Sequence, residues 1–514
     1  MTKPRTLGEL KASGYQPQSV KDELRANLRR ALSAGENPFP GIFGYERTVL
    51  PALHNAVLSR HDLLLLGLRG QAKTRLLRML VNLLDPEIPA IAGSEINEDP
   101  FRPITKFGRR ILSEKGDGAP ISWIPREERY REKLATPDVT IADLIGDIDP
   151  IKAATERRSY SDEEVIHFGI IPRTNRGIFA INELPDLQPR IQVGLLNILE
   201  ERDLQIRGFP VRIPLDILLV FSANPEDYTN RGNIITPLKD RISSQILTHY
   251  PDDVKIAAQI TAQEAWLDRD REPAIEIPDF FRELVEEIAF AARLSEFVDQ
   301  SSGVSARMPI SAVETLASNL ERRGLKNKES RVLPRLCDLP TTLPAITGKV
   351  EMVYEGEQQG AEVVAKKLIG TAIKKLFDAK FPAPDSGRPT QRRREEVEEG
   401  LEDPAGGVRR MRPAPEKIHP LYEPIVEWFS AGHKITISDD TPFPEHLASL
   451  ESVPGLRKAV EEHFAPATPE ERAVGMELVL EGLTQHLKIA REDLDSKVSY
   501  MEMLKFNLVK SRSN

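Results

Sequence analysis

The stretch LLLLGLRGQAKTRLLRML, residues 63–80, decides what kind of fold this sequence can form. It opens with four leucines, as a strand buried on both faces of a sheet does, and it ends in a helical pattern of apolar residues. Between them, Gly67 to Thr74 follow the phosphate-loop pattern G-x-x-x-x-G-K-[ST] at its first glycine, its lysine and its threonine. Ala72 stands at the second glycine. The stretch is therefore either a phosphate-binding loop or only a buried strand that runs into a helix, and the rest of the sequence is needed to choose.

Composition limits the class of protein. The chain has 514 residues, of which 40% are hydrophobic, so we expect two to four domains with real cores. Charged residues make up 29% and the net charge is −9, which speaks against general affinity for nucleic acids or membrane surfaces. Cys337 is the single cysteine, so no intrachain disulfide and no cysteine metal site is expected. We find neither a signal-peptide core nor a stretch of about 18 apolar residues, and we predict a cytoplasmic protein.

Strand-like apolar runs alternate with helical segments between residues 37 and 251, which is typical of a parallel sheet covered by helices. The runs are DLLLLG, PISWIP, GIFAIN and DILLVFSAN. The sequence thus predicts an α/β protein with a parallel-sheet core. The expected segments are a helical lead-in (1–36), the α/β core (37–251), a helical lid (252–338), an extension with the strand KVEMVYEG and a long helix (339–382), a flexible linker (383–415) and a separate, mostly helical C-terminal unit (416–514).

Two strands of the predicted core end in polar residues that suit nucleotide chemistry. The apolar run Gly177 to Ile181 is followed by Asn182 and Glu183, at the position where a phosphate-loop protein carries two acids. The run Ile217 to Phe221 leads to Asn224, whose amide could hold an attacking water. Each has a plainer interpretation: an acidic loop residue for Glu183, and a turn residue for Asn224, because Asn-Pro commonly starts turns.

Two arginines are candidates for stabilising charge on a transferring phosphate. Arg241 lies in PLKDRI near the end of the α/β region, and Arg307 lies in GVSAR just before a helix in which Pro309 suits the first turn. The alternatives are a surface arginine paired with Asp240 or a nearby acid, and an arginine in a helix-capping loop.

In their order and spacing, these motifs resemble those of AAA+ ATPases, and within them the clade of the magnesium chelatase ATPase subunit and the MoxR proteins. The resemblance covers residues 37–330 and includes NPFPGIFGYE before the first core helix. The segments ADLIGDIDPIKAA with FGIIPRTNRGIFAINEL, and LQIRGFPVRIPLDILLVFSANP, are similar to segments that carry two β-hairpins in the clade.

The resemblance implies a site for ATP and Mg²⁺. Lys73 would bind the β- and γ-phosphates, Thr74 would help to hold Mg²⁺, and Asn182 would stand at the second metal-facing position. The residues implied at the nucleotide are Gly67, Arg69, Gly70, Gln71, Ala72, Lys73 and Thr74 around the phosphates, and Ile42, Phe43 and Gly44 near the adenine.

The resemblance also implies how ATP would be hydrolysed. Glu183 would be the base, Asn224 the first sensor, Arg241 an arginine finger acting on a neighbouring subunit, and Arg307 a second sensor acting on its own chain. Ala72 and Asn182 depart from the pattern and are expected to weaken metal binding and slow turnover. An ATP hydrolase is therefore the leading hypothesis, and an ATP-binding scaffold with little or no hydrolysis is the alternative.

Partners follow from the same resemblance. It implies a homo-oligomeric ring, commonly a hexamer, that remodels a partner protein. A partner with a von Willebrand A domain would be a separate chain, since this sequence has no fitting D-x-S-x-S motif. A nucleic-acid motor is disfavoured by the acidic balance, and activation of a sigma factor by the lack of a GAFTGA-like loop. The sequence does not choose between tetrapyrrole metal insertion and another pathway.

Overall fold

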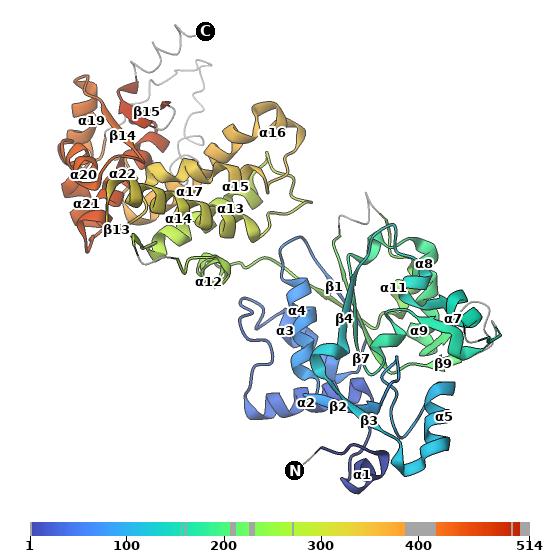
Figure 1. Cartoon of the computed structure of the whole chain (residues 1–514). Helices are drawn as coiled ribbons and strands as arrows, with labels where there is room; N and C mark the ends of the chain where they lie inside the picture. Colours follow the sequence, from blue (N-terminus) through green and yellow to red (C-terminus); the bar gives the residue numbers. More distant parts are fainter. Residues whose placement is uncertain are drawn as a thin grey trace, which may run out of the picture. The chain divides into compact units, whose positions relative to one another are not determined.

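The computed structural model describes residues 3–155, 157–159, 162–205, 212–225, 232–269, 272–385, 418–494 and 497–503. The chain divides into two compact units, Met1–Pro251 and Asp252–Asn514, and each is described by itself (Figure 1). Most of the linker predicted over 383–415 lies outside the described residues.

A five-stranded parallel sheet forms the centre of the first unit, in the order β11-β1-β10-β7-β4. Its strands are β1 (Leu63–Leu66), β4 (Tyr130–Leu134), β7 (Gly177–Asn182), β10 (Ile217–Ala223) and β11 (Ser244–Leu247). Every residue of β1, β7 and β10 is buried. The predicted α/β fold with a parallel sheet is therefore confirmed.

Helices cover both faces of this sheet, which explains why its central strands are apolar without a break. Successive side chains of a strand point to opposite faces. Leu63 and Leu65 accordingly join one core and Leu64 and Leu66 the other. The first core includes residues of α2 (Val20–Ala34), α3 (Val49–Leu58) and α4 (Lys73–Met79), and the second includes residues of α8 (Pro189–Gly194), α9 (Leu196–Glu200) and α11 (Thr236–Arg241) (Figure 1).

Short antiparallel pairs extend from the sheet. β5 (Gly146–Ile148) pairs with β6 (Ile166–Phe168), and β8 (Asp203–Gln205) pairs with β9 (Arg212–Pro214). Both lie in the segments where the sequence predicted hairpins. Further α-helices among the described residues of this unit are α1 (Leu7–Ala12), α5 (Lys106–Lys115), α6 (Ile141–Leu144) and α7 (Pro150–Thr155).

The prediction for PISWIP was wrong in one respect. These residues form β3 (Ile121–Pro125), but β3 pairs antiparallel with β2 (Glu87–Ile91) outside the parallel sheet. The sheet instead takes β4 and β11 as its outer strands. Neither was predicted, because each is an edge strand with exposed and charged or polar residues among apolar ones.

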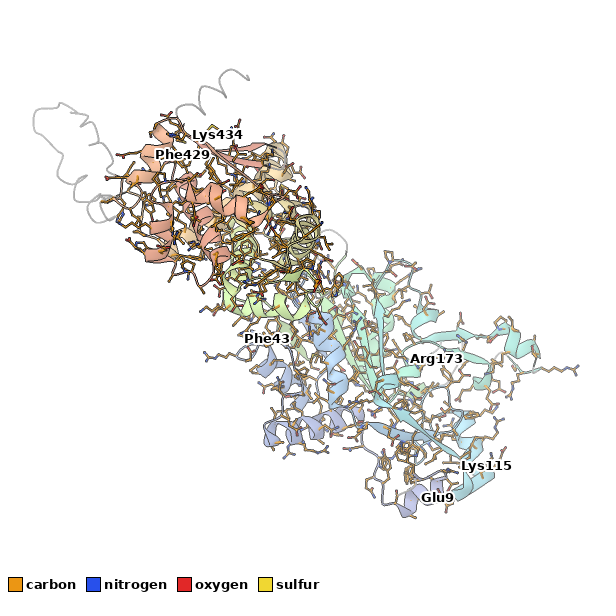
Figure 2. The ribbon with its side chains drawn as sticks, turned by 60° about the vertical axis from the view of Figure 1, so that its left-hand side comes forward. Glu9, Phe43, Lys115, Arg173, Phe429 and Lys434 are labelled. Carbon is orange, nitrogen blue, oxygen red and sulfur yellow. The ribbon has the colours of Figure 1, made fainter. Side chains whose placement is uncertain are left out.

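The second unit is mainly helical. Its larger helices are α12 (Val254–Glu264), α13 (Asp279–Leu294), α14 (Arg307–Asn327), α17 (Ala361–Lys380) and α22 (Pro469–Gln485). Shorter elements are β12 (Ala274–Ile275), β13 (Arg331–Val332), a 3₁₀ helix (Leu336–Thr342), α15 (Leu343–Thr347), α16 (Tyr354–Gln359), α19 (Glu423–Ser430), α20 (Phe443–Glu451) and α21 (Leu456–His463). A three-stranded antiparallel sheet in the order β14-β16-β15 completes the unit, from β14 (Ile435–Ser438), β15 (Ala490–Leu494) and β16 (Lys497–Met501). Phe429 and Lys434 flank the turn from α19 to β14 (Figure 2).

Two expectations for this region were wrong. The C-terminal residues do not form a separate unit, because α22 packs against α17 and both contribute to one continuous core. The helix α22 is buried around most of its circumference and therefore needs neighbours on several sides. The strand predicted at KVEMVYEG is also absent: Met352 makes only an isolated bridge with Val298, and α16 begins at Tyr354. Among the described residues, no helix combines the length and apolar character that crossing a lipid bilayer requires.

Candidate active site

The predicted phosphate loop and the predicted first sensor lie side by side at the carboxyl edge of the sheet. β1 and β10 run parallel with Leu66 beside Ala223. The loop starts directly after Leu66, and Asn224 directly follows Ala223. The amide of Gly67 donates to the Ala223 carbonyl at 3.2 Å. Asn224 is buried there, so its polar side chain sits within the structure beside the loop.

The pair Asn182–Glu183 ends β7 at the same edge. β10 and β7 run parallel with Phe221 beside Ile181, which sets Ser222 opposite Asn182. The Ser222 hydroxyl donates to Asn182 Oδ1 at 3.2 Å and accepts the Glu183 amide at 3.3 Å. Glu183 has φ 56° and ψ 50°, a left-handed conformation that is strained for a residue other than glycine. Ser222, which the sequence analysis did not single out, thus fixes both residues.

The loop itself is tightly wound. Gly67 has no room for a side chain, because an added Cβ would lie 2.0 Å from Thr248 Oγ1 and 2.2 Å from Gln71 Oε1. Gly70 has φ 73° and Ala72 has φ 56° with ψ 16°. The left-handed conformation is easy for glycine but unfavourable for alanine. Ala72 therefore occupies a position for which its side chain is poorly suited.

The Lys73 side chain is buried within the loop. Its Nζ donates to the carbonyls of Gly67 and Leu68, the second at 2.9 Å. An ammonium group held by loop carbonyls can exchange those partners for phosphate oxygens without leaving the loop. Thr74, the next residue, lies partly exposed in the first turn of α4.

Two tyrosines hold the loop in place from outside. Tyr45 Oη lies 2.9 Å from the carbonyl of Gln71 and 2.9 Å from that of His249. Tyr250 Oη donates to the Arg69 carbonyl at 2.7 Å. Burial raises the pKa of Tyr45, so it remains a neutral donor. The sequence analysis singled out neither tyrosine: Tyr45 lies in the quoted segment NPFPGIFGYE but was given no role, and Tyr250 lies in no quoted motif.

The segment predicted to lie near the adenine immediately precedes Tyr45. Ile42 is buried, Phe43 is half-buried, and Gly44 turns with φ 80°. The bond from Tyr45 to the loop therefore brings this segment next to the predicted phosphate site.

Arg241 lies at the other edge of the sheet. β11 runs parallel to β1 with Ser244 beside Leu63, so residues just before β11 lie at the amino edge. Arg241 ends α11 there and forms an ion pair with Glu200 at 2.7 Å. It is thus separated from the loop of its own chain by the length of the sheet.

Arg307 belongs to the second unit, where it is the first residue of α14 and is exposed. Its predicted action on the nucleotide stays a prediction.

Comparison with known proteins bears on this site. Residues 123–242 match the family described as AAA domain (dynein-related subfamily). Magnesium-chelatase subunit ChlI of Euglena gracilis is 27% identical over 214 residues, which is 40% of this chain and 56% of that protein. The chain thus spans about half the length of this curated relative.

Solved structures give weaker likenesses. A cryo-EM reconstruction of the complex between subunits BchI and BchD of magnesium chelatase is 19% identical, covering 63% of this chain and 98% of that one with a TM-score of 0.32. NtrX from Brucella abortus in complex with ATP is 13% identical, covering 61% and 53%, with a TM-score of 0.30.

The sheet order, the hairpins and the matched region define the first unit as an AAA+ domain. Within that class, the chain is similar to the magnesium-chelatase subunit ChlI.

Proposed function

We propose that this protein binds ATP with Mg²⁺ at the loop Gly67–Thr74 and hydrolyses it. One observation carries the proposal: the strand register brings the loop, the Asn182–Glu183 pair and Asn224 to a single edge of the sheet. Neighbouring strands are about 4.8 Å apart, so the tips of β1 and β7, with β10 between them, lie within about 10 Å of one another. A bound triphosphate can span that distance.

The chain's own residues suit this reaction. Lys73 supplies a buried positive charge for the phosphates, and Glu183 supplies a carboxylate that can take a proton from water. Mg²⁺, when bound, would neutralise charge on the phosphates, and Thr74 and Asn182 are the residues proposed to face it. Asn182 provides an oxygen without a negative charge, which favours weak metal binding.

The alternative function, an ATP-binding scaffold, has specific support in the strained Ala72 and in Asn182, whose Oδ1 accepts from Ser222. Replacing Asn182 by Asp restores the charge at this position. If the position faces Mg²⁺, the Asn182→Asp protein should need less Mg²⁺ for half-maximal phosphate release. An unchanged Mg²⁺ dependence would show that residue 182 does not face the metal.

The experiment that tests the proposed function is steady-state phosphate release with Mg²⁺ on the full chain, paired with direct measurement of ATP binding. Glu183→Gln should lower the turnover rate by about 100-fold or more while ATP still binds. Glu201→Gln, at an exposed acid after α9, should leave turnover unchanged. ATP binding without phosphate release in the wild type would favour the scaffold, and absence of ATP binding would refute both functions.

We further propose that the protein forms a hexameric ring. In the cytoplasm, this ring would act on a partner protein. The position of Arg241 at the amino edge supports an assembly in which this side chain serves a neighbour's site. The partner proposed is a separate chain with a von Willebrand A domain. Capture with the Glu183→Gln protein in ATP, compared with the nucleotide-free protein, would identify the partner.

A further inference from the structure

A cavity lined by several charged residues lies in the second unit. Its volume is about 340 Å³, within the range of small-molecule sites. Its walls come from the segment Arg323–Arg335, which includes β13, and from the beginnings of α20 and α22. The cationic residues lining it are Arg323, Lys328, Arg331 and Arg335, and the acidic ones are Glu329 and Glu470.

Arg335 is the unusual member of this set. The residue is only 3% exposed. Its Nη1 donates to the Thr441 carbonyl at 2.7 Å and to the Ser438 carbonyl at 3.5 Å. Within the part of the chain that the structure describes, no carboxylate forms an ion pair with its guanidinium. Burying a charge without a counter-ion is unfavourable, and burial lowers the pKa of Arg335. A bound anion would remove that penalty.

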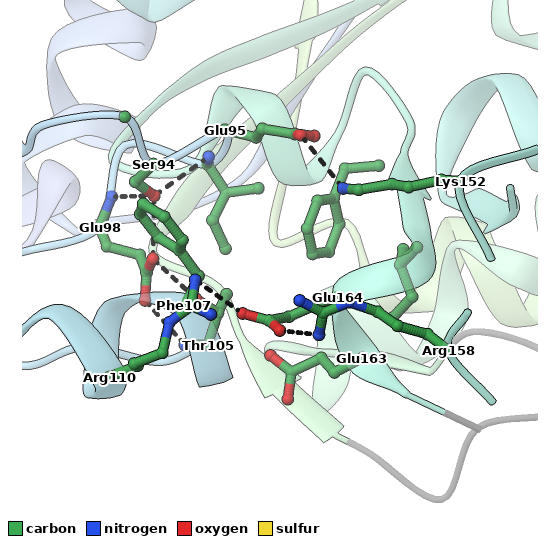
Figure 3. A pocket seen from close by; sticks show the side chains of 14 residues that line it. Ser94, Glu95, Glu98, Thr105, Phe107, Arg110, Lys152, Arg158, Glu163 and Glu164 are labelled. Carbon is green, nitrogen blue, oxygen red and sulfur yellow. Dashed lines mark hydrogen bonds and ion pairs between the residues drawn. The ribbon is translucent and has the colours of Figure 1, made fainter. Parts of the chain in front are cut away.

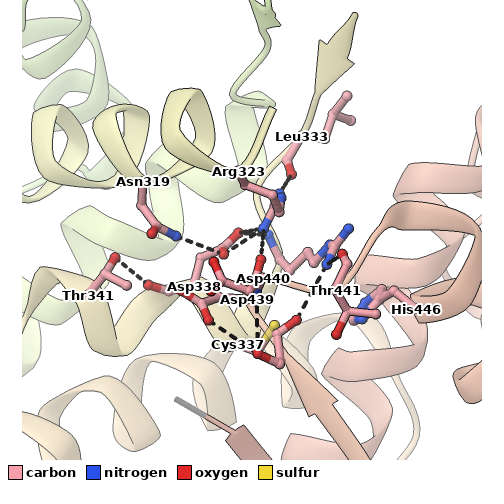
Figure 4. Close-up of polar contacts among 12 residues, drawn as sticks. Asn319, Arg323, Leu333, Cys337, Asp338, Thr341, Asp439, Asp440, Thr441 and His446 are labelled. Carbon is pink, nitrogen blue, oxygen red and sulfur yellow. Dashed lines mark hydrogen bonds and ion pairs between the residues drawn. The ribbon is translucent and has the colours of Figure 1, made fainter. Parts of the chain in front are cut away.

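The neighbouring buried arginine does not share this feature. Arg323 Nη1 lies 2.6 Å and 2.8 Å from the two carboxylate oxygens of Asp338. Figure 4 shows the Arg323 and Asp338 side chains pointing toward each other. Asp338 is itself fully buried and also accepts the Arg335 amide at 2.7 Å. This carboxylate pairs directly with Arg323, whereas its charge and that of Glu477 act on the Arg335 guanidinium only from beyond ion-pair distance.

The other charges of the cavity wall are of both signs. The Glu329 carboxylate accepts the Phe443 amide at 2.8 Å. Arg331 pairs with Glu276 at 2.6 Å and lies only 3.9 Å from Glu470. Lys328 is exposed, and no ion pair to it is found in the described residues. Arg331 and Lys328 can thus contribute positive charge at the cavity without breaking a buried pair.

A cavity in the first unit shows the opposite arrangement and serves as a contrast (Figure 3). It measures about 250 Å³, and each cation that lines it is paired with a lining carboxylate. Glu164 forms ion pairs with Arg110 and Arg158, and Lys152 lies 3.9 Å from Glu95. The cations of that cavity are thus all paired, whereas the buried Arg335 guanidinium has no ion pair among the described residues.

We infer that the cavity at Arg335 is a binding site for a small phosphate-bearing anion. A guanidinium matches the geometry of phosphate oxygens and binds them through paired N–H donors. Arg335 supplies the buried charge, with Arg331, Lys328 and the Ser330 hydroxyl at the mouth. Because the walls come from segments more than 100 residues apart in the sequence, a bound anion ties α20 and α22 to β13 and stabilises this unit against unfolding.

The test uses the full chain with Lys73→Ala, so that the proposed ATP site contributes no phosphate binding. Inorganic phosphate is titrated by calorimetry, citrate is titrated in parallel as a carboxylate anion, and thermal unfolding is followed with and without phosphate. Phosphate should bind and raise the unfolding temperature. Adding Arg335→Gln should weaken binding by tenfold or more, as expected for loss of charge-assisted hydrogen bonds. Adding Lys326→Ala, which removes an exposed pair with Asp440 outside the cavity, should leave binding unchanged.

A second variant covers the case that Arg335→Gln does not fold. Lys328→Asn with Arg331→Gln removes both charges at the mouth, and asparagine tolerates the left-handed backbone of Lys328, whose φ is 57°. This pair should also weaken phosphate binding. Absence of phosphate binding to the Lys73→Ala protein would overturn the inference. So would phosphate binding that neither variant weakens, or binding of citrate alone.

Discussion

At the scale of single residues, the loop that follows β1 stores strain at Ala72. Its φ of 56° lies in the left-handed region, which costs an L-residue with a Cβ roughly 1–2 kcal/mol. The sequence showed that alanine stands in place of glycine, but not whether the position requires a positive φ. The structure answers that question, because Ala72 adopts a positive φ directly before α4 begins.

Ala72→Gly should therefore stabilise the protein. Relief of strain exceeds the extra flexibility that glycine gives the unfolded chain, so we expect the free energy of unfolding to rise by about 1 kcal/mol. Urea unfolding, followed through the transition of the first unit, measures this change in the free energy of unfolding. The matched control is Ala52→Gly inside α3, where the same substitution should lower stability by about 1 kcal/mol. A decrease in both proteins would contradict the strain at Ala72.

Ser222 is a positioning residue in the proposed site. Its hydroxyl bonds both Asn182 Oδ1 and the Glu183 amide, so Ser222→Ala frees both residues without touching the phosphate loop. We expect the ATP turnover rate to fall about tenfold, as for other residues that orient a catalytic group, with ATP affinity unchanged. Ser222→Thr keeps the hydroxyl and should restore turnover. A loss of ATP affinity equal to the loss of turnover would instead indicate a general disturbance of the fold.

From the sequence, single site residues could be predicted only where they belong to motifs whose mechanism is known. Lys73, Glu183 and Asn224 were predicted because each follows a strand in a recognisable order. Ser222, Tyr45 and Tyr250 were not found, because they act through bonds to neighbouring backbone or side chains that only the folded register creates.

At the scale of elements, strands buried on both faces were predictable and edge strands were not. β1 and β10 appear in the sequence as unbroken apolar runs because helices cover both of their faces. β4, with the sequence YREKL, has only one neighbour in the sheet and is partly exposed. Because charged residues interrupt its apolar pattern, β4 could not be predicted as a strand from apolar runs. PISWIP has the apolar pattern of a core strand, but it pairs outside the parallel sheet.

The contact between α12 and α13 predicts how the stability of the second unit depends on pH. Glu286 of α13 is 2% exposed and accepts a hydrogen bond from Thr261 of α12. Burial raises its pKa from 4.5 to about 7, which means that the fold favours the neutral acid. The contribution of this group to stability is complete below pH 4.5 and is lost as the pH rises through 7.

Glu286→Gln removes that loss, since glutamine stays neutral and keeps an acceptor for Thr261. We expect the wild-type protein to lose about 2 kcal/mol more stability than the variant between pH 5 and pH 8. Urea unfolding at both pH values measures the difference. Glu283→Gln, on the same helix and partly exposed, should follow the wild type. Parallel pH profiles for wild type and Glu286→Gln would show that Glu286 is charged in the fold.

At the scale of the whole molecule, one chain does not bring all the predicted groups to one edge of its sheet. The loop, Glu183 and Asn224 meet at the carboxyl edge, while Arg241 lies at the amino edge, before β11. The sheet itself prevents Arg241 from reaching its own loop. To act on ATP, Arg241 has to reach the site of a neighbouring copy that approaches with the opposite edge, as in a head-to-tail ring.

Mixing two inactive variants tests this arrangement. Lys73→Ala should be inactive because its own site cannot hold the phosphates, and Arg241→Ala because it cannot serve its neighbour. In a mixed ring, the loop of an Arg241→Ala subunit meets the intact arginine of a Lys73→Ala subunit, so an equal mixture should recover about a quarter of wild-type phosphate release. Glu200→Gln, which removes the partner of Arg241 but keeps the arginine, controls for local disturbance and should retain activity. No recovery on mixing, from subunits shown to assemble together, would rule out action in trans and leave Arg241 as a surface arginine paired with Glu200.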